Sequence, residues 1–254
     1  MSDANEGLSS VRKAFDVLKA LKEQDGMRVS EVSEELDMPM STAHSHLSTL
    51  VDLEFATMEG DIYIVGTAAL ELGEYIKYRR RGDRLAEKYT QQLRRETGYR
   101  TVYMIEEHGR GVYLHTDSGE HPSWEHERAG EREPLHTVAA GKAILAELPK
   151  RRADEIVDER GLVERTGNTI TDRDELETEL EEIRERGYAL NDEENIEGVR
   201  AIGAAVHGRD GRVIGSFSVS GAANRMTGDE FRTQIPETVL AVTNEYELDL
   251  SIGD

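Results

Sequence analysis

The chain has 254 residues, and 52 acidic side chains against 31 Lys and Arg give it a formal net charge of -21. This length has room for two domains that each bury a core. The absence of cysteine excludes disulfides and thiolate metal sites. No apolar run approaches the ~20 residues of a membrane-spanning helix, and the first residues do not resemble a signal peptide. We expect a soluble cytoplasmic protein, whose acidity is typical of proteins that work in concentrated salt.

Residues 1–66 are predicted to form a small helical domain that ends in a hairpin. Ser10 is a candidate N-cap for a first helix, whose apolar residues recur at three- and four-residue steps until Gly26. A second helix with Ser30 as its N-cap is followed by a turn-length segment containing Pro39. A third helix then begins at Ser41, and this spacing is that of a helix-turn-helix.

The third helix has an apolar and a polar face. Its apolar stripe, which we expect to face the core, consists of Ala43, Leu47, Leu50 and Val51. The polar side chains that can hydrogen-bond to base edges in a major groove are Ser41, Thr42, Ser45, His46 and Thr49. We predict that these five residues bind DNA.

Two β-prone runs follow this helix directly. Phe55–Met58 and Ile62–Val65 flank Gly60 and predict a hairpin, which would be the wing. Any three-helix bundle contains short amphipathic helices, and it is the added hairpin that favours a winged helix-turn-helix. The acidity argues against DNA binding, because affinity usually comes from Lys and Arg at phosphates. Near 1 M salt, however, the Debye length is only ~3 Å, so contacts at hydrogen-bond range would decide.

Residues 67–97 are predicted to form linker helices. Helical composition continues from Thr67 past Tyr78 into a basic cluster of four arginines, and a second helix follows from about Asp83 to Thr97. The cluster consists of Arg79, Arg80, Arg81 and Arg84. These cations either contact phosphate or lie at a solvated helix end, where the helix dipole favours positive charge.

From residue 98 to residue 254 strands alternate with helices, which predicts one α+β domain. The expected strands are Arg100–Glu106, Gly111–Thr116, Tyr188–Asn191, Val199–His207 and Val213–Ser220. The expected helices are Arg151–Glu159, Asp172–Arg186 and a C-terminal helix from Thr227 to about Leu248, which would cover the sheet. In the last strand Ser216, Ser218 and Ser220 share one face. This row of hydroxyls is either a solvated edge or the wall of a polar pocket.

Residues 134–146 predict a helix that begins with small side chains. If Thr137 is its N-cap, Ala139 and Ala140 are the second and third helical residues, whose N–H groups have no partner within the helix. Either these amides attract a carboxylate, which the small side chains allow to approach, or Thr137 and water satisfy them.

The residues of the same region give little support to a catalytic function. Lys142 does not belong to a phosphate loop, because His136 stands where that motif needs glycine and Ala143 where it needs Ser or Thr. An enzyme would use His136 or His207 beside the serine face, but nothing resembles a nucleophile elbow. We therefore expect no catalytic residues.

A metal cluster is the other chemistry that we considered. Two histidines in Glu120–Glu127 could join His108 and His115. Their spacings match no compact ligand motif, and acidic loops explain them more simply. We therefore expect no metal site and no cofactor.

From about Ser9 to its end the chain resembles the IclR-type family of transcriptional regulators. Four places carry the resemblance: Ser41–His44, Ile64–Gly66, Leu135–Ala143 and Val213–Gly221. The resemblance implies a winged helix-turn-helix head, a linker helix and a GAF-like effector domain, in which helices flank an antiparallel sheet. It also implies a small organic acid as effector and assembly as a homodimer or a dimer of dimers.

The family's ligand contacts can be carried over by position. They fall on Ala139, Ala140, Asn191, Ala201, Ser218 and Ser220. Family members place an acid where Asn191 stands and a cysteine where Ala201 stands, so the effector's identity stays open. In the recognition helix the family often has arginine where Ser45 stands, which removes one contact to phosphate or guanine.

The sequence thus predicts a transcription factor, not an enzyme, with a double-stranded DNA operator and a small carboxylate as partners. Effector binding would shift the relative placement of two heads through the linker helices, which requires that the ligand bind one arrangement better than the other. The alternative, which the acidic head favours, is a metabolite-binding or protein-interaction module without DNA affinity.

Overall fold

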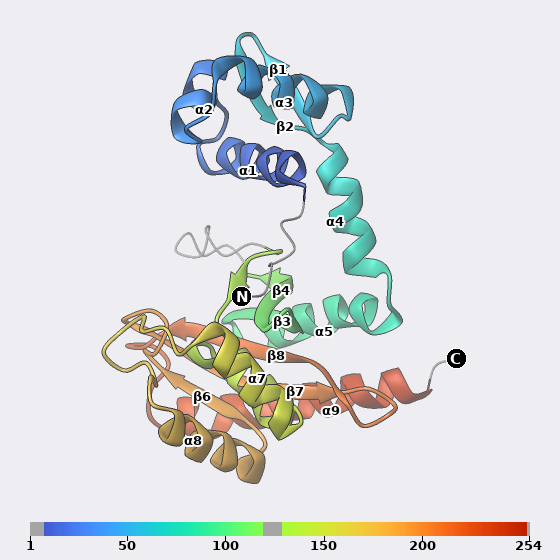
Figure 1. Ribbon diagram of the computed structural model, residues 1–254. Coiled ribbons are helices and arrows are strands. Elements are labelled where there is room, and N and C mark those ends of the chain that lie inside the picture. Colours follow the sequence, from blue (N-terminus) through green and yellow to red (C-terminus); the bar gives the residue numbers. More distant parts are fainter. Residues whose placement is uncertain (1–7, 119–128, 253–254) are drawn as a thin grey trace. The chain divides into compact units, whose positions relative to one another are not determined.

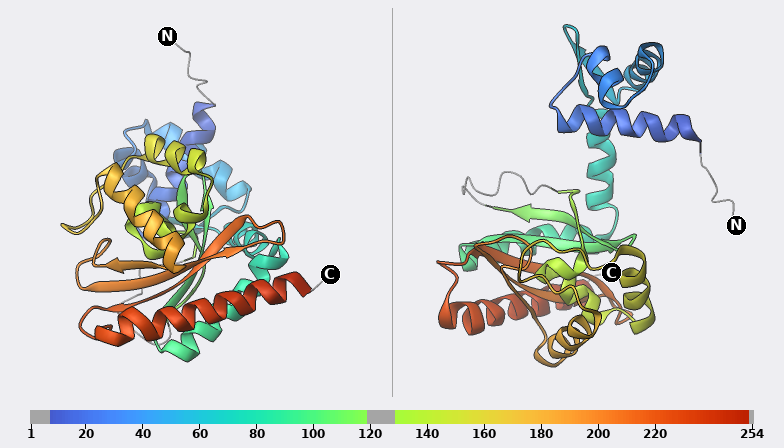
Figure 2. Two further views of the ribbon diagram at one scale, coloured as in Figure 1. Left: turned by 90° about the horizontal axis from the view of Figure 1, so that it is seen from below. Right: turned by 60° about the vertical axis from the view of Figure 1, so that its left-hand side comes forward.

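The computed structural model describes residues 8–118 and 129–252, and the chain divides into two compact units, Met1–Ile76 and Lys77–Asp254 (Figure 1). Two further views are given in Figure 2. None of the helices in the described ranges combines the length and the apolar character that crossing a membrane requires. Each unit is considered by itself below.

The first unit is a winged helix-turn-helix. Its elements are α1 (Ser9–Glu23), α2 (Val29–Glu35), α3 (Met40–Asp52), β1 (Ala56–Glu59) and β2 (Ile62–Val65). β1 and β2 pair antiparallel, and Gly60 in the turn between them has a φ of 68°, which glycine adopts without strain. The predicted helix-turn-helix and hairpin are both confirmed.

The core of this unit contains the stripe predicted for the third helix. Ala43, Leu47 and Leu50 are buried, whereas Val51 is half-buried. They pack with apolar side chains of α1, α2, β1 and β2, among them Val17, Leu21, Val32, Ala56 and Tyr63. α3 therefore turns its polar side away from the core.

The helices begin earlier than the serine caps predicted. The N-caps of α1, α2 and α3 are Leu8, Arg28 and Pro39, so Ser41 is the second residue of α3. At Pro39 the backbone is extended (φ -57°, ψ 140°), and its carbonyl accepts the N–H of Ala43 at 3.0 Å. Backbone geometry, rather than a hydroxyl cap, thus fixes where α3 starts.

Two helices follow the wing, and they differ in their packing. α4 (Ala68–Tyr78) has no buried residue, whereas α5 (Arg81–Thr97) buries Ala86, Tyr89 and Leu93 in the core of the second unit. α5 is thus part of the second unit, although we predicted that both helices form a linker. Arg81 donates to the backbone oxygen of Asp249 at 3.1 Å, so one residue of the basic cluster has a structural partner.

The second unit contains an antiparallel sheet in the order β5-β4-β3-β8-β7-β6. Its strands are β3 (Arg100–Glu107), β4 (Arg110–Asp117), β5 (Arg132–Glu133), β6 (Ala189–Asp192), β7 (Val199–His207) and β8 (Val213–Ala222). The five predicted strands are confirmed to within two residues at each end. The two-residue β5 is too short to show the alternation from which strands were predicted.

Helices cover both faces of this sheet. They are the 3-10 turn η2 (Leu135–Thr137), α6 (Ala139–Glu147), α7 (Lys150–Arg160), α8 (Arg173–Arg186), the π turn η3 (Glu230–Gln234) and α9 (Ile235–Ile252). α5 and α9 pack on one face, and α6, α7 and α8 contribute to a second core on the other (Figures 1 and 2). The predicted α+β architecture, with α9 covering the sheet, is confirmed.

Candidate functional site

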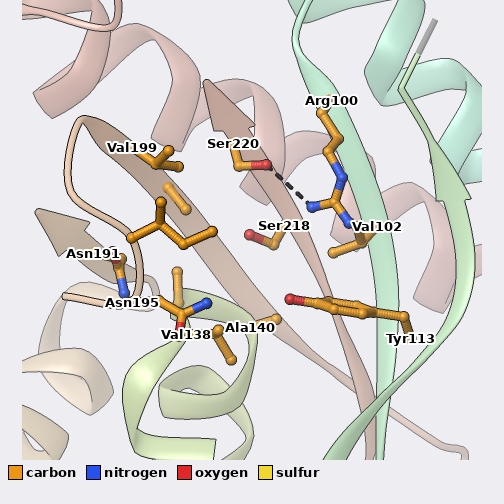
Figure 3. Close-up of a pocket in the computed structure, with 13 residues that line it drawn as sticks. Arg100, Val102, Tyr113, Val138, Ala140, Asn191, Asn195, Val199, Ser218 and Ser220 are labelled. Carbon is orange, nitrogen blue, oxygen red and sulfur yellow. Dashed lines mark hydrogen bonds between the residues drawn. The ribbon is translucent and has the colours of Figure 1, made fainter. Parts of the chain in front are cut away.

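A cavity of about 40 Å³ lies where the start of α6 meets the sheet (Figure 3). It is lined by Arg100, Val102, Tyr113, Val138, Ala139, Ala140, Asn191, Asn195, Ile196, Val199, Ala201, Ser218 and Ser220. All six residues that we predicted as effector contacts are in this set. They come from α6, β6, β7 and β8, and the fold brings them together.

The sheet side of the cavity is built by strand register. β8 lies between β3 and β7, so Ser220 is opposite Arg100 on one side and Ala201 on the other. Ser216, Ser218 and Ser220 are all buried. The row of hydroxyls is therefore not a solvated edge: Ser218 and Ser220 line the cavity, whereas Ser216 Oγ donates to the backbone oxygen of Ala140 at 2.9 Å.

The two lining hydroxyls differ in what they can offer a ligand. Ser218 Oγ donates its proton to the backbone oxygen of Ile202 at 2.7 Å, so its oxygen can only accept. Ser220 Oγ accepts from Arg100 Nη1 at 3.3 Å and keeps its own proton for donation.

The helix side is formed by the first residues of α6. Val138, with extended backbone, is the N-cap, so Ala139 and Ala140 are the first and second helical residues, not the second and third. Thr137 is not the cap, because its hydroxyl donates to the oxygen of Pro134 at 2.9 Å within η2. The amides of Ala139 and Ala140 still belong to the turn whose N–H groups have no partner inside the helix.

Asn191 stabilises the backbone on the α6 side of the cavity through two hydrogen bonds. Its Nδ2 donates to the backbone oxygen of Thr137 at 2.7 Å, and its Oδ1 accepts from the N–H of Glu194 at 3.2 Å. Both ends of the amide thus hold backbone just before α6 and just after β6. The loop that follows carries the lining residues Asn195 and Ile196.

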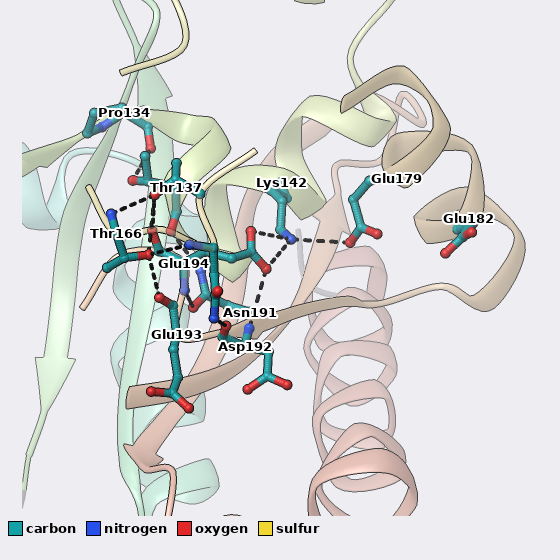
Figure 4. Close-up of polar contacts among 12 residues, drawn as sticks. Pro134, Thr137, Lys142, Thr166, Glu179, Glu182, Asn191, Asp192, Glu193 and Glu194 are labelled. Carbon is teal, nitrogen blue, oxygen red and sulfur yellow. Dashed lines mark hydrogen bonds and ion pairs between the residues drawn. The ribbon is translucent and has the colours of Figure 1, made fainter. Parts of the chain in front are cut away.

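A buried cluster of charged side chains stabilises the same loop through ion pairs (Figure 4). Lys142 is 1% exposed, and its Nζ lies 2.7 Å from Glu194 Oε2 and 3.2 Å from Glu179 Oε1. Arg186 approaches the same Glu179 at 2.8 Å. Burial raises the pKa of Glu194, and the Lys142 ammonium opposes this rise. The lysine that we weighed as a phosphate ligand instead joins α6 to α8 and to the cavity loop.

Sequence reasoning missed three polar residues of the cavity, which are Arg100, Tyr113 and Asn195. Arg100 is 5% exposed, and its guanidinium lies 5.2 Å from the ring centroid of Tyr113. Tyr113 points its hydroxyl toward the middle of the cavity (Figure 3). An arginine opening a strand of otherwise mostly apolar residues was the available signal, because buried cations are rare unless they have a partner.

The predicted DNA-binding residues lie on the side of α3 away from its core stripe. Ser41, Ser45 and Thr49 are exposed, and Thr42 and His46 are half-buried. Ser45 Oγ donates to the oxygen of Ser41 at 2.8 Å, and Thr49 Oγ1 to that of Ser45 at 2.9 Å.

A hollow beside this surface was not predicted. Ser45, His46 and Thr49 also border a hollow between α3 and α1, whose apolar walls include the exposed Val11 and Phe15.

Other partners are found for three of the histidines considered for metal or catalytic roles, His115, His136 and His207. His115 Nε2 lies 2.7 Å from the backbone oxygen of Asp83, and His136 Nε2 lies 3.1 Å from that of Val163. Burial lowers the pKa of His136. His207 contacts Glu247 and Glu147. Neither His136 nor His207 is among the residues that line the cavity.

The metal cluster can be assessed only in part. Within residues 8–118 and 129–252 no group of three or more His, Asp or Glu side chains is arranged to hold a metal ion. All of Glu120–Glu127 lies outside the described residues.

A winged helix-turn-helix unit together with a sheet unit that encloses a donor-lined cavity defines a ligand-responsive, DNA-binding regulator. Residues 10–60 match the family model of the IclR helix-turn-helix domain, and residues 83–246 match that of the bacterial transcriptional regulator IclR C-terminal domain. The chain belongs to the IclR family of transcriptional regulators.

Individual relatives agree with this assignment. The chain is 32% identical to the probable HTH-type transcriptional regulator ArcR of Halobacterium salinarum, over 97% of both chains. It is 29% identical to the HTH-type transcriptional regulator XynR of Escherichia coli, over 93% of this chain and 96% of the relative. These relatives are transcriptional regulators, which confirms the prediction of a DNA-binding regulator over that of an enzyme.

Solved structures share the fold. The IclR of Thermotoga maritima superposes with a TM-score of 0.81 at 28% identity, over 95% of this chain and 98% of that one. An IclR homolog from Microbacterium hydrocarbonoxydans, complexed with 4-hydroxybenzoate, has a TM-score of 0.80 at 19% identity, over 96% and 100% of the two chains. At that identity the second likeness concerns the fold alone.

Proposed function

We propose that this regulator binds a small organic acid in the cavity beside α6, and that binding changes the affinity of its winged helix-turn-helix unit for an operator. The observation that carries the proposal is the convergence of the six predicted effector contacts and a buried arginine on one cavity. We further propose that it acts in a salt-rich cytoplasm as a homodimer or a dimer of dimers.

The chemistry of the lining favours an anion. Arg100 supplies a full positive charge, Ser220 a hydroxyl proton, and the start of α6 supplies amides and the positive end of a helix dipole. None of the described residues that line the cavity is acidic. A carboxylate loses its hydration on entering such a site, and these donors compensate for that loss.

The chain offers a short route from the cavity toward the linker. Arg100 opens β3 only three residues after α5 ends at Thr97, and α5 follows α4 directly. The hydroxyl of Thr101 donates to the backbone oxygen of Thr90 at 2.8 Å, which fastens β3 to α5. A ligand that moves Arg100 would therefore act on the helix next to the linker, provided that it binds one arrangement better than the other.

The DNA contact is tested on the polar face of α3. We expect the Ser45→Ala, Thr49→Ala double variant to bind its operator about 10- to 100-fold more weakly, because each good base contact contributes roughly 1–3 kcal/mol of discrimination. Gel shift with genomic fragments in molar KCl measures this loss. Ser30→Ala removes an exposed hydroxyl from α2 and should bind like the unmodified chain. If the unmodified chain retards no fragment, the result favours the alternative, a metabolite-binding or protein-interaction module without DNA affinity.

The effector site is tested at Ala140, which is 2% exposed and lines the cavity. We expect Ala140→Val to bind operator normally but to lose its response to small acids, because the added methyl groups occupy ligand space. The matched control is Ala143→Val, a buried position of the same helix outside the cavity lining. A thermal-shift screen of acids in high salt measures binding, since a ligand at ~100 times its Kd adds about 2.7 kcal/mol of stability. An acid response that survives in Ala140→Val and disappears in Ala143→Val would place the effector elsewhere.

A further inference from the structure

We propose that the acid bound in this cavity is a short aliphatic dicarboxylate. One carboxylate would be held by Arg100 and Ser220, and the other by the amides that open α6. This inference rests on the proposed function and specifies the ligand of the same site.

The first argument is that the anion-binding groups lie at two separate ends. Arg100 and Ser220 come from β3 and β8 and are joined by a hydrogen bond of 3.3 Å. Figure 3 shows them at one end of the cavity, with Val138 and Ala140 at the other and Ser218 between them. A ligand with a single carboxylate engages one of these ends, whereas a ligand with two carboxylates engages both.

The second argument is that the described side chains in the middle of the cavity carry no positive charge. Ser218 has its proton on the backbone oxygen of Ile202, so it presents only an acceptor. Asn191 has its Nδ2 and Oδ1 engaged with backbone groups. Other walls are Val102, Val199 and similar apolar side chains, which fit methylene groups. Positive charge therefore lies at the two ends of the lining, and neutral groups, among them the Tyr113 hydroxyl, lie between them.

The third argument is charge. A guanidinium buried as deeply as that of Arg100 favours an anion strongly, because an effective dielectric well below that of water strengthens the attraction. The start of α6 adds the equivalent of roughly half a positive charge. Two carboxylates thus meet two positive ends, and within residues 8–118 and 129–252 no acidic residue of the lining repels them.

The fourth argument is size. A dry protein cavity of ~150 Å³ is known to hold a benzene ring. The cavity here measures about 40 Å³, which favours acids of two or three carbon atoms over longer dicarboxylates and aromatic acids alike.

The experiment compares acids of matched length on the full chain in molar KCl. Oxalate, malonate and succinate are titrated calorimetrically against acetate, propionate and butyrate, with benzoate as the aromatic probe. We expect at least one of these dicarboxylates to bind about tenfold or more tightly than its monocarboxylate counterpart. Arg100→Gln should weaken dicarboxylate binding by about 10- to 100-fold, the usual effect of losing a charged hydrogen bond, and should remove the preference.

Control variants keep the test interpretable. Arg132→Gln removes an arginine of β5 that pairs with Glu107 at 2.7 Å outside the cavity, and it should leave the preference intact. If Arg100→Gln does not fold, Ser220→Ala removes only the hydroxyl at the same end and should reduce the preference as well.

Three results overturn the inference: monocarboxylates that bind as tightly as dicarboxylates, a preference that both cavity variants retain, or binding of benzoate alone. In each of these cases, if an acid binds to the unmodified chain and Ala140→Val abolishes that binding, the proposed function still holds. If no acid in this panel or in the wider screen binds, the inference and the proposed effector site fail together.

Discussion

Replacing Lys142 with Met is expected to lower the free energy of unfolding by about 3–5 kcal/mol, because removing one partner of a buried ion pair leaves the other charge uncompensated. The charges left behind are those of Glu194, which is 8% exposed, and Glu179. For a chain of this size the loss corresponds to a fall in Tm of about 10 °C. Thermal unfolding at constant salt, followed by circular dichroism, measures it.

Two variants distinguish the stability contributed by this ion cluster from the general effect of losing a lysine. Lys150→Met removes an exposed lysine that pairs with Glu177, and such surface pairs contribute about 0–1 kcal/mol. Adding Glu194→Gln to Lys142→Met should recover part of the lost stability, because the amide carries no charge. If Lys142→Met unfolds no more easily than Lys150→Met, the cluster does not hold the cavity loop as inferred here.

Gly203→Ala is expected to be nearly as disruptive and to remove effector binding. A Cβ at this position of β7 would lie 2.7 Å from the backbone carbon of Ala139 and 2.7 Å from the nitrogen of Ala140. Because both neighbours are backbone atoms, the start of α6 must move away from the sheet. Overpacking of this kind typically costs about 1–3 kcal/mol, and here it displaces the amides proposed to hold the ligand.

The matched control is Gly167→Ala. Nothing lies within 4 Å of a Cβ built at this exposed glycine, so this substitution should change neither Tm nor acid binding. Calorimetric titration of both variants with the best acid of the panel distinguishes a local clash from a general glycine effect. Normal acid affinity in Gly203→Ala would contradict the proposed role of the α6 amides.

Much of the fold could be predicted because periodicity reports which face is buried. The spacing of Ala43, Leu47 and Leu50 identified the core side of α3, and alternation predicted β3 and β4 to within one residue at each end. Several helix starts were wrong because a helix can also begin on extended backbone without a hydroxyl cap, as at Arg28 and Pro39. Thr137 bonds to Pro134, for example, and the extended Val138 begins α6 instead.

The cavity was less accessible to prediction because its members are distant in the sequence. Six of them were carried over from the family resemblance, and Ala139, Ala140, Ser218 and Ser220 had also been singled out from the residues themselves. Arg100, by contrast, becomes a neighbour of Ser220 only through the pairing of β3 with β8, strands that are not consecutive. Lys142 was considered alone, since its partners Glu179 and Glu194 lie 37 and 52 residues further along. Local patterns do not contain such pairings.

The back-bonded hydroxyls of α3 have a consequence for how this head would discriminate among sequences. With their protons on the carbonyls of Ser41 and Ser45, the oxygens of Ser45 and Thr49 expose only lone pairs. Phosphate oxygens also expose only lone pairs, so these two side chains gain nothing from the DNA backbone. Their complementary groups are the exocyclic amino groups of adenine and cytosine in the major groove. On this helix, selectivity for bases would thus be independent of attraction to the sugar-phosphate chain.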